Sequence, residues 1–162
     1  MLHGLNSHVG HGAHLAEYFS LNGFVTVGFD HRGFGRSEGR SGYVSDLDTH
    51  LEDCKKFFSI VFPMYEGLPR FVLGLSMGGM SSYHLTLADP HLFDGAVMMA
   101  PALMNSVGGC VVSLTKFLGK MLPDHMRLTK PIYGKASKNP AITDFVKKDK
   151  YVFADRMSLS TL

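Results

Sequence analysis

Short apolar runs alternate with amphipathic segments over the first hundred residues of the chain. Residues 24–29 are apolar and β-branched and lie between Gly23 and a polar turn, which predicts a buried strand. Between Asp46 and Phe62 the apolar residues recur at helical spacing, and Pro63 closes the segment. This pattern predicts an amphipathic helix whose buried face carries Leu47, Leu51, Cys54, Phe58 and either Val61 or Phe62.

The following segments continue the alternation. Residues 71–73 predict a second strand, residues 77–88 a helix that ends before Asp89-Pro90, and residues 96–100 a third strand. Short connections between such elements are typical of right-handed crossovers and of a parallel sheet with helices on both faces. The predicted fold class is therefore α/β. Beyond Pro101 the pattern weakens: residues 111–122 predict one more helix, and the rest is basic and irregular.

Composition narrows the class of protein without naming its function. The 162 residues are 45% hydrophobic and 19% charged, which fits one folded domain and excludes collagen-like, coiled-coil and disordered chains. A net charge of +2 is too small to indicate nucleic acid as a partner. Residues 116–150 nevertheless hold nine lysines and arginines against three aspartates. Two interpretations remain open, a solvated basic face and a surface that contacts anionic lipid.

Cysteines and apolar runs bear on the compartment. Cys54 and Cys110 are the two cysteines and form no C-x-x-C pair, so neither a disulfide framework nor a thiolate zinc site is expected. No apolar run approaches the ~20 residues that span a bilayer, and residues 1–20 do not resemble a signal peptide. We expect a cytoplasmic protein, with peripheral membrane contact through residues 103–150.

The sequence holds only incomplete motifs for cofactors and metals. His8, His11 and His14 recur every third residue, but on an α-helix such positions spread over about 120°, so no metal site is expected. The glycines at 33 and 35 lack the third glycine of a dinucleotide loop, and no Gly-Lys precedes Ser or Thr as in a phosphate-binding loop. We expect no cofactor, and a turn beneath the active site over residues 30–37.

The most specific motif is Gly74-Leu75-Ser76-Met77-Gly78, a G-x-S-x-G sequence between a predicted strand and a predicted helix. In that setting a sharp turn presents the serine hydroxyl above the sheet. A helix-capping role would explain Ser76 but not Gly74 and Gly78, where a side chain would collide with the neighbouring strand or helix. We predict that Ser76 is a nucleophile.

A serine nucleophile also requires hydrogen-bond donors for the oxyanion of the tetrahedral intermediate. The backbone N–H of Met77, the residue after the serine, is one such donor. The second comes from a loop that follows an earlier strand, and His3-Gly4-Leu5-Asn6 begins with the His-Gly pair of such loops. This assigns the second donor to the backbone N–H of Leu5.

These motifs together resemble the monoglyceride lipase and lysophospholipase branch of the serine hydrolases with the α/β-hydrolase fold. The resemblance rests on His3-Gly4 with the following helix, on residues 30–39, and on Gly74 to Gly79. It implies a single partial domain over residues 1–162, with a core over 3–102 and a cap over 103–150. It also implies a lid around residues 103–122 that receives an acyl chain, although ordinary core packing explains the same apolar spacing.

The chain departs from the family in its catalytic triad and in its first strands. In this fold an acid and then a histidine follow the serine, on loops after later strands. We call the sharp turn at Ser76 the elbow, and the helix after it the elbow helix. Three histidines follow Ser76: His84 is on the elbow helix, His91 follows the end of that helix, and His125 is in the cap. None is placed to act as the base. Only Met1 and Leu2 precede the His-Gly loop, where the family has strands. We therefore expect a fragment, or a truncated gene model, of a longer hydrolase.

Two functions remain at this point. The first is a serine esterase that cleaves carboxylic esters of lipid-like substrates, monoacylglycerols or lysophospholipids, through an acyl-enzyme at Ser76. The second is a catalytically inactive remnant of the fold that binds a membrane or another partner through its basic segment.

Overall fold

A two-stranded parallel sheet forms the centre of the part of the chain that the computed structural model describes, residues 1–44, 46–103 and 137–152. Strands β1 (Phe71–Leu75) and β2 (Gly95–Met99) pair in register, with Phe71 opposite Gly95 and Leu75 opposite Met99. Both strands coincide with predicted ones to within two residues at either end. Their parallel pairing through helix α3 (Met77–Ala88) confirms the predicted α/β class.

Leu2 extends the sheet on the free side of β1. Its N–H donates to the carbonyl of Leu73 over 2.8 Å, and its carbonyl accepts from the N–H of Leu75 over 3.1 Å. These two bonds form an isolated parallel bridge to Gly74. The side chain of Leu2 is 1% exposed, so this short extension also anchors the core.

The predicted strand over residues 24–29 does not form. These residues carry no strand ladder. The Met1 amino group donates to the Val27 carbonyl over 2.6 Å, and the Phe24 ring lies 6.4 Å from the ring of Phe71 in β1. The segment next to residues 24–29 consists of Met1 and Leu2, which lie between these residues and β1. Two residues are too few to form a strand ladder with residues 24–29. An apolar β-branched run predicts the conformation of a segment but not its pairing.

The predicted amphipathic helix forms, but its buried residues are His50, Cys54 and Phe58, and Leu47 at its first position is 37% exposed. Helix α2 (Leu47–Val61) begins at Asp46, whose carboxylate accepts from the Thr49 N–H over 2.7 Å, and it continues into the 3-10 helix η2 (Phe62–Tyr65). Before them come the 3-10 helix η1 (Val9–Gly12) and helix α1 (Ala13–Leu21). The elbow helix α3 has the predicted bounds.

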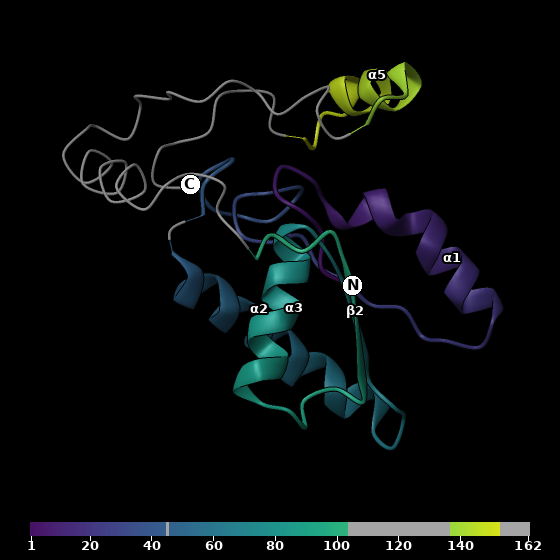
Figure 1. The fold of residues 1–162 in the computed structure, drawn as a ribbon, viewed down its shortest axis with the longest axis vertical. Helices are drawn as coiled ribbons and strands as arrows, with labels where there is room; N and C mark the ends of the chain where they lie inside the picture. Colours follow the sequence, from purple (N-terminus) through teal and green to yellow (C-terminus); the bar gives the residue numbers. More distant parts are fainter. Residues whose placement is uncertain (45, 104–136, 153–162) are drawn as a thin grey trace.

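Helices lie on both sides of the strands, with α2 and α3 on one side and α1 on the other (Figure 1). The core is on the α2 and α3 side, where Cys54, Phe58 and Leu85 pack against Leu2 and Val72 of the sheet. The α1 side is more open, because Phe71 and Val97 remain 58% and 54% exposed there. The site described below is built at the end of β1, where these layers meet.

A short helix near the end of the described chain was not predicted. Helix α5 (Pro140–Lys148) starts at Asn139, whose side chain accepts from the Ala141 N–H over 3.0 Å. The Asn-Pro start is a helix signal that the basic composition of the segment obscured. The predicted helix over 111–122 and nearly all of the predicted lid lie outside the described residues. Among the residues that were described, no helix is long and apolar enough to cross a bilayer.

Candidate active site

Ser76 occupies the sharp turn between β1 and α3 with φ 54° and ψ −110°. Positive φ is costly for a residue with a side chain and persists only where the surroundings enforce it. Here the Ser76 N–H donates to the Met99 carbonyl over 2.9 Å, and the Ser76 carbonyl accepts from the N–H groups of Met80 and Ala102. The end of β2 and the first turn of α3 therefore hold the strained serine in place.

The glycines around Ser76 are required by close backbone contacts. A Cβ at Gly74 would lie 2.2 Å from the Gly78 carbonyl oxygen and 2.5 Å from the hydroxyl oxygen of Ser82. A Cβ at Gly78 would lie 2.2 Å from the carbonyl oxygen of Leu2. Strand, elbow and helix can approach this closely only where side chains are absent.

The His-Gly loop lies against the serine. A Cβ at Gly4 would be 3.4 Å from the Cβ of Ser76 and 3.3 Å from the Leu75 carbonyl oxygen. Leu5 follows Gly4 in a turn, and Asn6 has a φ of 57° that turns the chain away. Met77 lies at the first position of α3, where backbone N–H groups are not used within the helix. The loop therefore lies beside the serine, and the assignment of the Leu5 and Met77 N–H groups as oxyanion donors stays a prediction.

His3 orients this loop rather than the serine. Its Nε2 accepts from the His31 N–H over 2.9 Å, so its Nδ1 carries the proton and donates to the Gly4 carbonyl over 2.8 Å. Burial lowers the pKa of His3 to about 4, which keeps the ring neutral. Residues 30–37 form the turn beneath, where the Asp30 carboxylate accepts from the N–H groups of Val9 and Arg36.

A catalytic base for Ser76 is not found in residues 1–44, 46–103 and 137–152. No histidine of these residues forms a hydrogen bond with the Ser76 hydroxyl. His84 packs on Tyr83 along α3, His91 lies in the loop after the helix, and His125 lies outside the described residues. The expectation that none of these three acts as the base stays a prediction.

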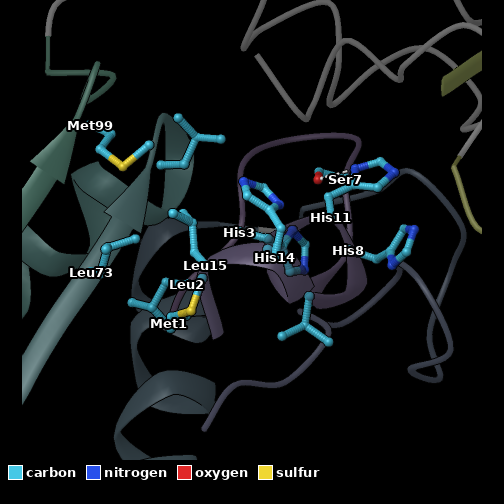
Figure 2. A pocket seen from close by; sticks show the side chains of 13 residues that line it. Met1, Leu2, His3, Ser7, His8, His11, His14, Leu15, Leu73 and Met99 are labelled. Atoms are coloured by element: carbon cyan, nitrogen blue, oxygen red, sulfur yellow. Dashed lines mark hydrogen bonds between the residues drawn. The ribbon is translucent and has the colours of Figure 1, made fainter. Parts of the chain in front are cut away.

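A cavity of about 140 Å³ opens beside the sheet, between β1, β2 and α1 (Figure 2). Apolar side chains of Met1, Leu15, Leu73 and Met99 line one part of it, and histidines line the other. Leu75, the residue before the serine, also contributes to the wall. The cavity therefore combines an apolar surface with a polar end, and its lining includes Leu75 of the turn but not Ser76.

His8 and His11 converge, contrary to the prediction from α-helical spacing. His8 caps the 3-10 helix η1 and His11 lies within it, and positions three apart in such a helix are eclipsed. Their Nε2 atoms lie 2.7 Å and 3.0 Å from the Asp149 carboxylate. His14 lies exposed on α1 and takes no part. The Gly10 N–H donates to Nδ1 of His8, so the His8 proton is on Nε2 and points at Asp149. This placement favours a hydrogen-bonded cluster over a metal ligand set.

A buried cluster of His31, His50 and Cys54 was not anticipated from the sequence. Their nitrogen and sulfur atoms lie within 4.8 Å of one another, beneath the His-Gly loop. His50 and Cys54 are four residues apart on α2, a spacing that places both side chains on one face, while His31 comes from the turn after residue 29.

Comparison with known proteins places the whole chain among hydrolases. Residues 1–162 match the family described as "Serine aminopeptidase, S33". A monoacylglycerol lipase of Mycolicibacterium smegmatis is 34% identical over 125 residues, 76% of this chain and 45% of that protein. A monoglyceride lipase of Mus musculus is 29% identical over 153 residues, 93% of this chain and 50% of that protein.

A solved structure shares the fold. The crystal structure of Paleococcus ferrophilus monoacylglycerol lipase matches with a TM-score of 0.78 and 28% identity, over 98% of this chain and 60% of that one. The chain thus spans about half the length of the curated relatives. These similarities confirm the resemblance that the motifs suggested.

Proposed function

Because the chain belongs to the serine aminopeptidase family S33 and has the α/β-hydrolase fold, we propose that it is the Ser76-bearing part of an esterase that cleaves carboxylic esters of lipid-like substrates. The observation that carries the proposal is the positive φ of Ser76 at the junction of β1 and α3. A strained nucleophile at a strand-to-helix turn is the arrangement that exposes a serine hydroxyl to substrate.

In the proposed reaction the Ser76 oxygen attacks the ester carbonyl carbon and its proton passes to a base. The carbonyl oxygen becomes an oxyanion that accepts hydrogen bonds from the backbone N–H groups of Leu5 and Met77. The bond to the alcohol then breaks, and the base returns the proton to the leaving alkoxide. Water hydrolyses the resulting acyl-enzyme and releases a fatty acid and the free Ser76 hydroxyl.

The base and its supporting acid are proposed to lie outside the described residues. Support comes from the order of the triad in this fold, in which acid and histidine follow the serine on later strands. Support also comes from His3, His8 and His11, because both ring nitrogens of each are engaged in hydrogen bonds to groups other than Ser76.

The substrate class rests on the cavity and on the relatives. The apolar wall of Leu15, Leu73 and Met99 suits an acyl chain, and its position beside Leu75 leads toward the serine. The relatives are named for monoacylglycerol hydrolysis. We therefore propose monoacylglycerols or lysophospholipids as substrates, rather than the amino-terminal amides that the family description suggests.

A membrane surface is the proposed partner. Helix α5 exposes Ile142 and Phe145, which are 50% and 64% accessible, and ends in Lys147 and Lys148. Exposed apolar residues next to lysines suit a helix that lies in the interface of an anionic membrane. Such contact would bring the enzyme to substrates that reside in bilayers.

The second candidate, an inactive remnant, is favoured by one observation, that no base reaches Ser76 in the described chain. The decisive experiment uses the protein purified from its native source. Its intact mass is measured, and it is then given a monoacylglycerol, a lysophospholipid and an aminoacyl amide. Release of fatty acid supports the esterase, whereas binding to vesicles without hydrolysis of any of the three supports the remnant.

A further inference from the structure

Three potential metal ligands meet in the interior between α2 and the turn over residues 30–37. His31, His50 and Cys54 are 1%, 6% and 0% exposed, and their ligand atoms lie within 4.8 Å of one another. A buried cysteine alone is ordinary core packing. Two imidazoles beside it require a further explanation, because histidine is costly to bury without partners.

His31 supplies that further observation. Both of its ring nitrogens are buried without a hydrogen-bond partner. The ring lies between those of His3, at 4.3 Å, and His50, at 4.5 Å, and against Phe29, so its neighbours do not satisfy it. A buried polar group without a hydrogen-bond partner is rare, and it calls for a ligand that would bind to it.

His50 is held in the tautomer that a ligand needs. The Ser81 hydroxyl donates to the Met77 carbonyl over 2.9 Å, so it accepts the proton of His50 Nε2 over 2.8 Å. The lone pair of His50 is therefore on Nδ1. A second hydrogen bond that fixes tautomer and ring orientation is the usual support of a metal-bound histidine.

We propose that His31, His50 and Cys54 form a three-coordinate site for a soft metal ion, Cu(I). Thiolate and imidazole together are ligands that this ion favours. Metal bonds of about 2.0 Å to nitrogen and 2.3 Å to sulfur place trigonal ligand atoms about 3.5 to 3.7 Å apart. Contraction of the cluster by about an ångström closes the site.

The charge balance selects a monovalent ion. On binding, the Cys54 thiol releases its proton to solvent, and the thiolate with Cu(I) forms a neutral unit. Zn²⁺ with the same ligands leaves one uncompensated positive charge in the interior, which is costly. The acidic neighbour on α2, Asp53, is already paired with Arg32 at 2.6 Å on the surface. In the metal-free protein, burial raises the pKa of Cys54 to about 12, so the sulfur is protonated until a metal displaces the proton.

Anaerobic titration of the 162-residue chain with Cu(I) against the chromophoric chelator bathocuproine disulfonate tests the site. We expect one Cu(I) per chain, and an affinity at least 100-fold lower in Cys54→Ser and His50→Gln. The matched controls Cys110→Ser and His11→Gln, which remove the other cysteine and a histidine of the surface cluster, are expected to keep the wild-type affinity. Circular dichroism establishes that each variant is folded.

X-ray absorption of the wild-type complex keeps the test independent of the variants. A shell of one sulfur and two nitrogens supports the site even where Cys54→Ser fails to fold. The proposal is overturned by any of three results: no stoichiometric Cu(I) binding, a spectrum without sulfur, or tighter binding of Zn²⁺ than of Cu(I) to the cluster. Absence of binding would assign the unpaired His31 nitrogens to buried water.

Discussion

Gly78 of the elbow helix and Leu2 of the sheet touch through their backbones, so that a Cβ at Gly78 would lie 2.2 Å from the Leu2 carbonyl oxygen. The same carbonyl accepts from the Leu75 N–H, one residue before the serine. Leu2, which precedes the His-Gly loop, is thereby in contact with the residues before and after Ser76. The gap between the Leu2 backbone and α3 admits only a residue without a side chain at position 78.

Replacing this glycine is expected to destabilise the chain. Gly78→Ala forces the backbone of Leu2 or of α3 to move, and overpacking of this kind lowers the free energy of unfolding by about 1–3 kcal/mol. Urea denaturation measures the change. Gly12→Ala is the control, because its Cβ would meet only the mobile end of the Met1 side chain. Equal stability of both variants would show that the elbow is looser than described.

Ser76 is expected to react with a fluorophosphonate in the protein from its native source. In the proposed mechanism the elbow presents the hydroxyl to the reagent, and the backbone N–H groups of Leu5 and Met77 stabilise the adduct. Ser76→Ala should abolish labelling, as followed by mass spectrometry of the modified peptide. Ser59→Ala, which removes an exposed serine of α2, is the control and should label normally.

The 162-residue chain by itself should label far more slowly. Loss of the triad histidine costs on the order of 10⁶ in rate in a related mechanism, and no described histidine contacts Ser76. Rapid labelling of this chain at Ser76 would place the base within residues 1–162. Labelling at another residue in Ser76→Ala would contradict the nucleophile itself.

The cluster of His8, His11 and Asp149 makes stability depend on pH. Burial by itself raises the pKa of Asp149, but hydrogen bonds from His8, the Tyr151 N–H and His11 outweigh it and hold the pKa at about 2. For His11, burial first and His8 second lower the pKa below 6.5, against the opposing effect of Asp149 and Asp30.

Both shifts predict loss of stability on acidification. Below pH 6.5 the unfolded chain binds a proton at His11 that the folded chain resists, and below pH 3.8 it binds one at Asp149. The free energy of unfolding should therefore fall as pH decreases from 7 to 2. Urea denaturation of wild type and Asp149→Asn measures it, and their difference should shrink between pH 4 and pH 2. A difference that stays constant over that range would exclude the lowered pKa of Asp149.

Helix α5 is expected to bind anionic vesicles. Each lysine near the surface contributes about 1 kcal/mol at low salt, and the attraction fades as the Debye length falls from about 10 Å at 0.1 M to about 3 Å at 1 M. Co-sedimentation with anionic and neutral liposomes at both salt concentrations measures it. Phe145→Ser should weaken binding, whereas Ile60→Ser, a similarly exposed apolar residue on α2, should not. Equal binding to neutral and anionic vesicles would leave α5 a solvated surface.

Local pattern predicted the elements that depend on local chemistry. The bounds of α3 and the start of α2 followed from glycine, proline and the Asp46 cap, and the two paired strands followed from short apolar runs. Residues 24–29 failed as a strand because pairing depends on a neighbour distant in sequence. The pairing of Leu2 with β1 could not be predicted for the same reason, because two residues are too short to show a strand pattern.

The site divides along the same line. The G-x-S-x-G pattern correctly predicted the sharp turn at Ser76, because the glycines that such a turn requires lie within two residues of the serine. The approach of His8 and His11 to Asp149, and of His31 to His50 and Cys54, joins segments up to 141 positions apart. The prediction that His8 and His11 point in different directions was wrong, because it assumed an α-helix and the chain forms a 3-10 helix there.

The hydrogen bond from the Ser76 N–H to the Met99 carbonyl allows opening of the elbow to be measured by hydrogen exchange at Ser76. An amide exchanges its hydrogen with solvent only in the moments when its bond is broken, and the rate gives the population of that open state. Deuterium uptake at position 76 would then measure how often the serine loses its strained conformation. If the end of β2 frays, Ser76 and Ala102 should exchange together. The opening rate of this strand end would then set how long the proposed nucleophile keeps its conformation.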